Sequence, residues 1–169
     1  VSFPRSGHHM AVKLMSNAFE ASNQTWSYCE AYQAGNSCTD EHTVRKSHDF
    51  QLTDPVIPSQ VYVVLVRRSR FRQLESYYRF NCKYAHQTPY PQDCSVSVRE
   101  FFDSNRIFYS LFYHKWYSKS QAEPERVRLV FYEDLVDRPL LSLVGILDFV
   151  TEAATRRASS TAGLEDVSG

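Results

Sequence analysis

The sequence predicts an α/β fold, a three-layer sandwich with helices on both faces of a central parallel sheet. A short β-rich run followed by apolar residues at helical spacing occurs three times, in residues 1–19, 61–80 and 127–150. Strands that alternate with helices favour this fold class. Residues 61–66 are hydrophobic almost without interruption, which is typical of a strand buried on both faces, as in a parallel sheet.

The first unit is expected to be a strand at residues 1–3, a tight loop at residues 4–7 and a helix. The apolar residues of that helix are Met10, Val12, Leu14, Met15, Ala18 and Phe19. Residues 22–58 are harder to assign, since β-like stretches at residues 26–28 and 43–50 flank a loop.

The second unit places a helix over residues 70–80 after its strand. One or two helices rich in aromatic residues follow within residues 96–119. In the third unit, a strand at residues 127–132 leads to a helix that Asp137 caps and Pro139 opens. The expected core face of this last helix consists of Leu140, Leu143, Val144, Leu147 and Val150.

The length and composition of the chain favour one domain. With 169 residues, of which 43% are hydrophobic, the chain is expected to form a single domain over residues 1–152. Residues 153–169 are rich in Ala, Ser, Thr and Gly without apolar periodicity, which predicts a flexible tail.

The 19 basic and 19 acidic side chains cancel, so no nucleic-acid partner is expected. The longest apolar stretches are shorter than the roughly 20 residues of a membrane span, so none is expected.

The four cysteines are too few for a disulfide-rich scaffold and lack the paired C-x-x-C spacing of zinc sites. Free thiols in a cytoplasmic protein are the first interpretation. The alternative joins Cys29 to Cys38 and Cys82 to Cys94 across short loops, and would place the chain in the lumen of the secretory pathway. No metal site is predicted, because the histidines and cysteines show no diagnostic spacing.

Residues 4–7, P-R-S-G, join a strand to a helix N-terminus, where backbone N–H groups and the positive end of the helix dipole converge. Ser6 and Gly7 let an anion approach the backbone, and Arg5 adds a fixed charge with several donors. The G-x-x-x-x-G-K-[ST] pattern of Mg-nucleotide sites is absent. The loop is therefore expected to bind a phosphate, and the alternative is an ordinary turn between a strand and a helix.

Four motifs resemble those of the sulfotransferase family. Residues 2–9, S-F-P-R-S-G-H-H, resemble its 5'-phosphosulfate loop, P-[KR]-S-G-T-T. Residues 68–78, R-S-R-F-R-Q-L-E-S-Y-Y, resemble its 3'-phosphate segment, R-[DN]-P-x-[DE]-x-x-x-S-Y-Y. Residues 46–48, K-S-H, resemble its K-T-H, and residues 131–135, F-Y-E-D-L, resemble the Y-E-D-L that ends a later strand. The motifs occur in the family's order over residues 1–150.

The resemblance implies a P-loop NTPase-like fold and transfer of a sulfuryl group from 3'-phosphoadenosine 5'-phosphosulfate (PAPS), which leaves 3'-phosphoadenosine 5'-phosphate (PAP). The acceptor would be a hydroxyl or amine of a small molecule or carbohydrate, and the oligomeric state stays open. Arg68 and Ser76 match the residues that hold the 3'-phosphate, and Tyr132 is expected to contact the adenine. The cofactor-binding residues implied in this way are Arg5, Ser6, Gly7, His8, His9, Met10, Arg68, Ser76 and Tyr132.

The resemblance also implies the catalytic residues. Sulfuryl transfer needs cations that stabilise the oxygens of the moving group. Arg5 is expected to face the bridging oxygen at the 5'-phosphate, and Lys46 to reach the sulfuryl oxygens. His48 is the expected general base, because imidazole titrates near neutrality, and Asp49 or another carboxylate is the alternative. No metal ion is implied.

The chain departs from the family pattern in three places. His8 and His9 replace two threonines, and the family's C-terminal G-x-x-G element is absent. Ser69 and Arg70 replace the acidic or amide residue and the proline of the second motif. A register that uses Arg67 instead of Arg68 leaves the serine one position out. Two other functions therefore stay open, a P-loop kinase that binds Mg-ATP and a nucleotide-binding relative without catalysis. For His48 the alternative is a structural histidine.

Overall fold

The computed structural model contains five helices and four strands within the residues that it describes. The described residues are 1–23, 25–30, 44–49, 52–53, 56–57, 60–84 and 96–162. In chain order the elements are α1 (His8–Ala21), β1 (Tyr28–Glu30), β2 (Val44–Lys46), β3 (Tyr62–Val66), α2 (Arg70–Tyr84), α3 (Val98–Ala122), β4 (Val127–Phe131), α4 (Tyr132–Asp137) and α5 (Pro139–Ala162).

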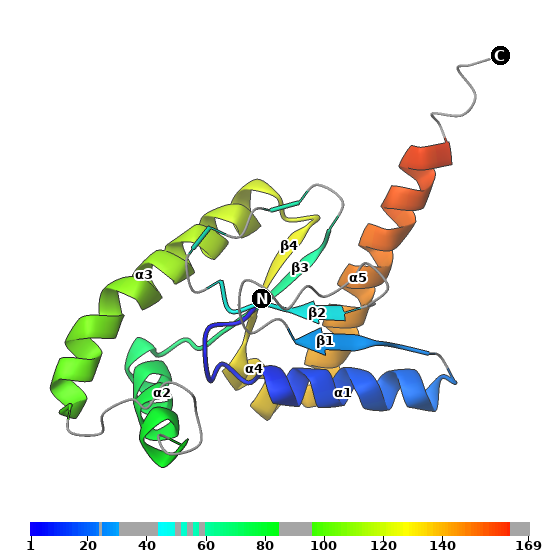
Figure 1. Ribbon diagram of the computed structural model, residues 1–169. Coiled ribbons are helices and arrows are strands. Elements are labelled where there is room, and N and C mark those ends of the chain that lie inside the picture. The colour runs from blue at the N-terminus through cyan, green and yellow to red at the C-terminus, as the bar shows by residue number, and fades with distance from the viewer. Residues whose placement is uncertain are drawn as a thin grey trace.

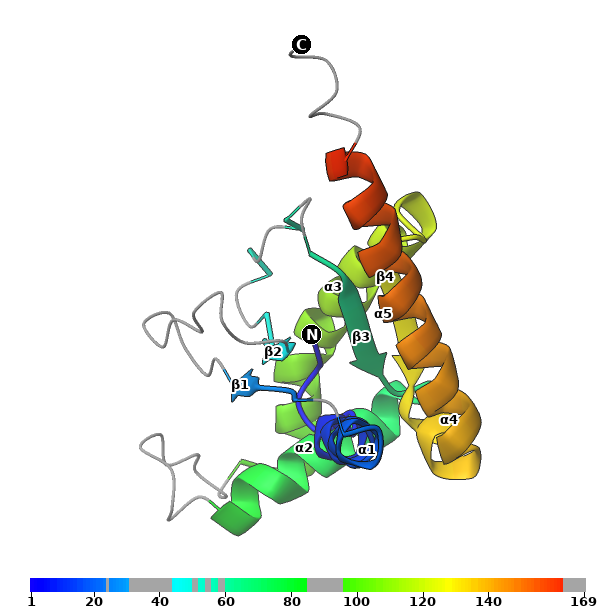
Figure 2. The same ribbon diagram turned by 90° about the vertical axis from the view of Figure 1, so that its right-hand side faces the viewer.

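The strands form two separate two-stranded parallel sheets (Figures 1 and 2). β3 pairs with β4 from Tyr62 opposite Val127 to Val66 opposite Phe131. β1 pairs with β2 along their full lengths. The predicted three-layer, P-loop NTPase-like sandwich around one central parallel sheet is therefore wrong.

The N-terminal segment explains the difference. Ser2 forms a single isolated parallel bridge with Leu65 of β3, and its N–H donates to the Ser47 carbonyl after β2 at 2.9 Å. The chain turns away at Pro4, which has no N–H to continue a ladder. Residues 1–3 therefore touch both strand pairs but are too short to join them into one sheet. Hydrophobic patterning predicts an extended segment, but not how far its pairing continues.

Several local predictions are confirmed. β3 and α2 lie where the second unit places them, and α3 is one helix of 25 residues. In the third unit the strand ends at Phe131, and α4 separates it from α5. Pro139 opens α5 as expected, whereas Asp137 ends α4 and does not cap α5.

The predicted core face of α5 is wrong. Three residues expected there are exposed, namely Leu140, Val144 and Val150. The helix instead buries Ile146, Phe149 and Ala153, which are three and four residues apart. Residues 140–150 are apolar on more than one helical face, so the pattern alone does not decide which face packs inward.

α5 continues through residues 153–162, the first part of the segment for which the sequence predicts a tail, and leads away from the rest of the molecule (Figure 1). Residues 163–169 lie outside the described residues. Neither α5 nor any other helix in the described part of the chain is long and apolar enough to span a membrane.

Two hydrophobic clusters pack against opposite faces of the β3–β4 pair. The first comprises Phe3, Tyr62, Val64, Val66, Leu74, Tyr109, Phe112, Trp116 and Val127. The second comprises Ala11, Leu65, Val130, Leu135 and Ile146. Phe3 is fully buried, with the Tyr109 and Phe112 ring centroids 4.9 and 5.5 Å from its own. Burying such a side chain contributes about 1.5–3 kcal/mol, so Phe3 fixes the segment that precedes the loop.

Asp49 fastens the segment after β2 to α3. Its side chain is buried, and Oδ2 accepts hydrogen bonds from Lys115 Nζ at 2.6 Å and from Trp116 Nε1 at 3.0 Å. A buried carboxylate requires such donors. The contact holds Lys46 and His48 against the N-terminal segment.

The two cysteines within the described residues differ in state. Cys29 in β1 is disulfide-bonded, whereas Cys82 in α2 has a free thiol. The alternative bridge from Cys82 to Cys94 is therefore wrong. Cys38 lies outside the described residues, so its pairing with Cys29 stays a prediction.

Candidate anion-binding site

A pocket of about 160 Å³ lies at the N-terminus of α1, and we call it the α1 pocket. Its walls come from the loop before α1, from α1 itself, from the residue after β3 and from the start of α4. The lining residues are Arg5, Gly7, His8, His9, Arg67 and Tyr132. All except Arg67 belong to the cofactor-binding set that the resemblance implies.

The loop before α1 is closed by Ser6. Arg5 and Gly7 on either side of it have positive φ angles of 66° and 87°. The Ser6 N–H donates to the Phe3 carbonyl at 3.1 Å, and its hydroxyl donates to the same carbonyl. Since Ser6 is fully buried, its hydroxyl stabilises the loop and does not line the pocket.

Gly7 is required where the loop meets Tyr132. Its φ of 87° lies in the left-handed region that glycine adopts most readily. A Cβ atom at this position would overlap the Tyr132 ring. The absence of a side chain therefore lets the aromatic ring close one side of the pocket.

Two residues of α2 hold the loop in place. Gln73 is fully buried, and its Nε2 donates to the Pro4 carbonyl. Its Oε1 has no hydrogen-bond partner among the described residues. The Arg5 guanidinium lies over the Phe80 ring, 4.7 Å from the centroid. The loop is thus attached to the helix that carries the second motif.

The N-terminus of α1 presents unpaired donors to the pocket. The first N–H groups of any α-helix lack a partner within the helix. The N-cap residue Gly7 makes no side-chain hydrogen bond, and no acidic residue lies in the first turn. The positive end of the helix dipole therefore favours an anion here. Met10 can offer only its N–H, because its side chain packs against the cluster around Ala11.

Arg67 is the lining residue outside the implied set. Its guanidinium lies 4.1 Å from the Tyr132 ring centroid, and Nε donates to the Arg5 carbonyl at 3.3 Å. Side chains alternate along a strand, and Arg67 continues the series of Val63 and Leu65, which pack on the α1 side of the sheet. That alternation is the sequence signal that identifies Arg67 as a pocket residue.

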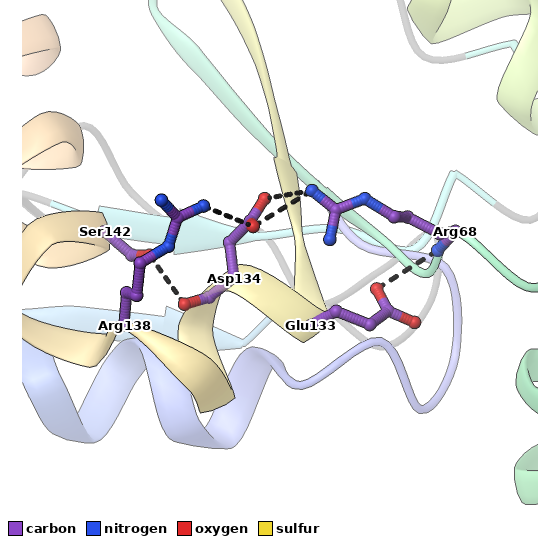
Figure 3. A network of polar contacts seen from close by, with 5 residues as sticks. All are labelled: Arg68, Glu133, Asp134, Arg138 and Ser142. Atoms are coloured by element: carbon purple, nitrogen blue, oxygen red, sulfur yellow. Dashed lines mark hydrogen bonds and ion pairs between the residues drawn. The ribbon is translucent and has the colours of Figure 1, made fainter.

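Arg68 is engaged outside the pocket (Figure 3). Its Nη2 donates to both Asp134 carboxylate oxygens at 2.9 and 2.8 Å, and its backbone N–H donates to Glu133 Oε2 at 3.1 Å. Arg138 also donates to Asp134 Oδ1 at 3.2 Å, and the Ser142 hydroxyl donates to the Asp134 carbonyl. The bond from Arg68 lowers the pKa of Asp134, and the same bond raises the pKa of Arg68. The two motifs that contain Arg68 and Asp134 therefore bind each other.

Ser76 is half-buried in α2 and is not among the residues that line the α1 pocket. The structure gives its hydroxyl no hydrogen bond with a described residue. Arg68 and Ser76 are the pair implied for the 3'-phosphate. Neither of them is among the described residues that line the pocket.

Lys46 and Glu30 form an ion pair beside the pocket. Lys46 is buried, and burial lowers its pKa to about 8. The two residues are register partners at the ends of the parallel strands β1 and β2. Sequence reasoning missed Glu30, because only the pairing of two short strands places it opposite Lys46. Knowledge of the register between β1 and β2 would have identified Glu30 as the neighbour of Lys46.

Three imidazoles, which we call the histidine cluster, gather next to this pair. The ring centroids of His8 and His9 are 3.8 Å apart, and those of His8 and His48 are 5.8 Å apart. Glu30 Oε1 lies 3.5 Å from His8 Nε2 without making a hydrogen bond to it. The cluster therefore joins two of the motifs, residues 2–9 and residues 46–48.

Burial and neighbouring cations keep the histidine cluster neutral. Burial, followed by the charge of Lys46, lowers the pKa of His8 to about 3 and that of His48 to about 4. The same two causes lower the pKa of His9. At neutral pH, His8 and His48 therefore carry no charge.

The tautomer of His48 follows from its hydrogen bond. Its Nδ1 lies 2.7 Å from the Ser2 carbonyl oxygen, which can only accept. Nδ1 therefore carries the hydrogen, and Nε2 carries the basic lone pair. By contrast, Asp49 faces Lys115 and Trp116, which occupy its carboxylate.

The pocket offers cations and N–H donors. Within the residues that the structure describes, no three His, Cys, Asp or Glu side chains are arranged to hold a metal ion. A ligand with several negative charges fits this chemistry best. No protein-family model, curated protein or solved structure matches the chain, so its function is inferred from the chemistry of the site.

Proposed function

We propose that this protein is a PAPS-dependent sulfotransferase that binds its cofactor in the α1 pocket and sulfates a hydroxyl or amine of a small molecule or carbohydrate. One observation carries the proposal. Five residues that the sequence motifs assign to the same cofactor line one pocket, namely Arg5, Gly7, His8, His9 and Tyr132. Arg5, Arg67 and the α1 N-terminus supply the positive charge that a phosphosulfate requires.

In this proposal the phosphosulfate lies at the N-terminus of α1. Arg5 faces the bridging oxygen and stabilises the leaving phosphate as the bond to sulfur breaks. Lys46 reaches the sulfuryl oxygens by sharing or leaving its ion pair with Glu30. The neutral imidazoles of His8 and His9 stand where the family pattern has hydroxyl groups.

The acceptor loses a proton as its oxygen or nitrogen attacks sulfur. That proton passes to a base, the bond between sulfur and the bridging oxygen breaks, and PAP leaves with the bonding electrons. His48 is the first candidate, since Nε2 carries a lone pair, although a pKa of about 4 makes it a weak base. Glu30 is the second, because it lies beside Lys46 while the Asp49 carboxylate is occupied.

The two candidate bases make different predictions. Replacing the true base removes sulfuryl transfer while PAP binding persists. Glu30→Gln and His48→Gln should therefore be compared in single-turnover assays with PAPS and in calorimetric PAP binding. Asp49→Asn is not an informative variant, because loss of the carboxylate removes the contacts that hold the segment after β2.

The disulfide at Cys29 bears on the compartment. Disulfides persist in oxidising compartments and are rare in the cytosol. It supports the secretory-pathway lumen over the cytoplasm as the place where this protein works. Expression of the protein in an oxidising and in a reducing compartment, followed by counting of free thiols on the intact chain, tests this assignment. A disulfide that forms only in the oxidising compartment would support it.

Calorimetric binding of PAP beside AMP and Mg-ATP tests the function. We expect PAP to bind at least tenfold more tightly than AMP, because the 3'-phosphate adds charge-assisted hydrogen bonds. Better binding of Mg-ATP would favour a kinase. PAP binding without transfer from PAPS in an acceptor screen would indicate a nucleotide-binding relative without catalysis.

The arginine that holds the 3'-phosphate is found by comparing Arg67→Ala with Arg68→Ala. Arg67 already lines the pocket, whereas Arg68 must leave Asp134 to take part. Arg72→Ala is the matched control, since Arg72 is exposed on α2 and does not line the pocket. If Arg72→Ala loses as much affinity for PAP as Arg67→Ala and Arg68→Ala do, the losses reflect the overall surface charge and not a specific contact.

A further inference from the structure

His8 is a buried residue of the α1 pocket, and one of its ring nitrogens makes no hydrogen bond. The residue is 8% exposed, its Nε2 has no hydrogen-bond partner among the described residues, and it lines the α1 pocket. A buried polar atom is normally paired, so such an exception asks for a missing partner. Glu30 Oε1 lies 3.5 Å from Nε2 without making a hydrogen bond to it, so an anionic ligand atom in the pocket that His8 lines is a candidate for this partner.

The groups around His8 determine what that partner must be. The charged and titratable groups that face the histidine cluster are Arg5 from the loop, Glu30 from β1, Lys46 from β2, Arg67 after β3, Tyr132 from α4 and the amino group of Val1. Cations outnumber the single carboxylate, and Lys46 already engages that carboxylate. In the unliganded protein, burial first and these cations second oppose a positive charge on His8, and together they lower its pKa to about 3.

We propose that the α1 pocket binds its anion together with a proton, and that the His8 imidazole receives this proton. The inference rests on the proposed function only in requiring that the pocket bind an anion. An anionic oxygen beside Nε2 accepts an N–H hydrogen bond and reverses the sign of the local potential. Both effects favour the imidazolium over the neutral ring. This uptake is specific to the histidine, because a hydroxyl at the same position donates without changing charge.

Linkage fixes the sign of the pH effect. His8 is neutral in the empty pocket above about pH 4 and protonated in the complex until the pH exceeds its pKa there. Between these limits each complex formed takes up one proton. Affinity therefore rises up to about tenfold for each unit by which the pH falls, and it becomes constant at higher pH.

Calorimetry on the full chain measures the uptake directly. PAP is titrated at several values between pH 5 and pH 8 in pairs of buffers with different protonation enthalpies. The phosphates of PAP themselves take up protons near pH about 6. Inorganic sulfate stays a dianion over this range, so the His8 ring is followed by imidazole ¹⁵N NMR at saturating sulfate as a second probe.

We expect about one proton taken up per PAP after correction for the ligand, a ¹⁵N shift of His8 to the imidazolium position with sulfate, and loss of the uptake in His8→Asn. PAP binding without uptake at every pH would overturn the inference and leave the proposed function standing. Uptake that survives in His8→Asn and disappears in His48→Asn would also overturn it, by moving the proton to His48. Absence of PAP binding would instead contradict the proposed function. If His8→Asn does not fold, the NMR shift of the unmodified protein decides.

Discussion

The N-termini of α1 and α3 use the same backbone groups in opposite ways. At α3, the Ser97 hydroxyl accepts from the Glu100 N–H at 3.2 Å, and the Glu100 carboxylate accepts from the Ser97 N–H at 2.8 Å. The side-chain hydrogen bond to Ser97 lowers the pKa of Glu100. At α1, Gly7 offers no side chain and no acidic residue follows. The start of α3 is capped by its own side chains, whereas the start of α1 has no such cap.

The surroundings of the two helix starts differ in the same sense. Ser97 and Glu100 are exposed, so water also reaches their donors. The start of α1 borders a pocket that holds a buried imidazole and two arginines. Of these two helix starts, only that of α1 is both uncapped and beside a pocket, and this is why we propose the anion site there.

Gly7→Ala should break the α1 side of this comparison most severely. The left-handed backbone and the overlap with Tyr132 together cost about 2–4 kcal/mol, and PAP binding should be lost. Urea unfolding and calorimetry measure both. Gly145→Ala in α5 is the matched control, because a Cβ there meets only the flexible end of Arg128. The control should be neutral or stabilise by about 0.5–1 kcal/mol. Equal effects at both glycines would contradict the assigned role of Gly7.

Acid should destabilise the α1 side before it affects the α3 side. The folded pKa of His48 is about 4, below the ordinary value of 6.5, so the unfolded chain binds more protons in between. Stability is therefore full above about pH 6.5 and falls as the pH is lowered toward 4, by about 3 kcal/mol for this residue. Urea titrations at a series of pH values measure the slope. His48→Gln should reduce the slope, and His8, whose folded pKa is about 3, should account for most of what remains. An unchanged slope in this variant would show that His48 does not contribute.

Arg67→Ala should weaken PAP binding by roughly tenfold to a hundredfold, the range of a charge-assisted hydrogen bond. The variant removes a cation that lines the α1 pocket, together with its hydrogen bond to the Arg5 carbonyl. Calorimetry with PAP and with AMP separates a 3'-phosphate contact from a 5' contact. An affinity equal to that of the unmodified protein would exclude Arg67 from the site.

Ser97→Ala should have the smallest effect, a loss of about 1 kcal/mol of stability with PAP affinity unchanged. It removes the acceptor at the start of α3 and one partner of Glu100. Thermal unfolding and calorimetry on the same sample measure both quantities. A weaker PAP complex in this variant would show that the two helix starts are not independent.

Residues whose positions depend on local chain geometry could be predicted from the sequence. The loop of Arg5 to Gly7 follows from a strand, a small residue and a glycine before a helix, and the pocket contains Arg5 and Gly7. Tyr132 follows from a motif at the end of a strand, and it lies against the same loop. In both cases the signal lies within a few residues of the side chain that matters.

The remaining features depend on contacts between distant segments. Glu30 becomes part of the site only through its register with Lys46, which no pattern of either short strand specifies. Arg68 has the spacing of the motif, but Asp134 engages its guanidinium. The sheet prediction is wrong for a similar reason, since the length of pairing at Ser2 depends on where Pro4 turns the chain.

The hydrogen bond from Gln73 to the Pro4 carbonyl has a mechanical consequence. Gln73 sits in the first turn of α2 and belongs to residues 68–78, which resemble the 3'-phosphate motif. Pro4 begins the loop that would hold the other end of the proposed ligand. Because the amide is fully buried, α2 cannot tilt without pulling the loop. In the proposed complex, the segments that contact the two phosphates of PAP would then be connected by this hydrogen bond. A displacement of α2 at one phosphate would therefore shift the loop at the other.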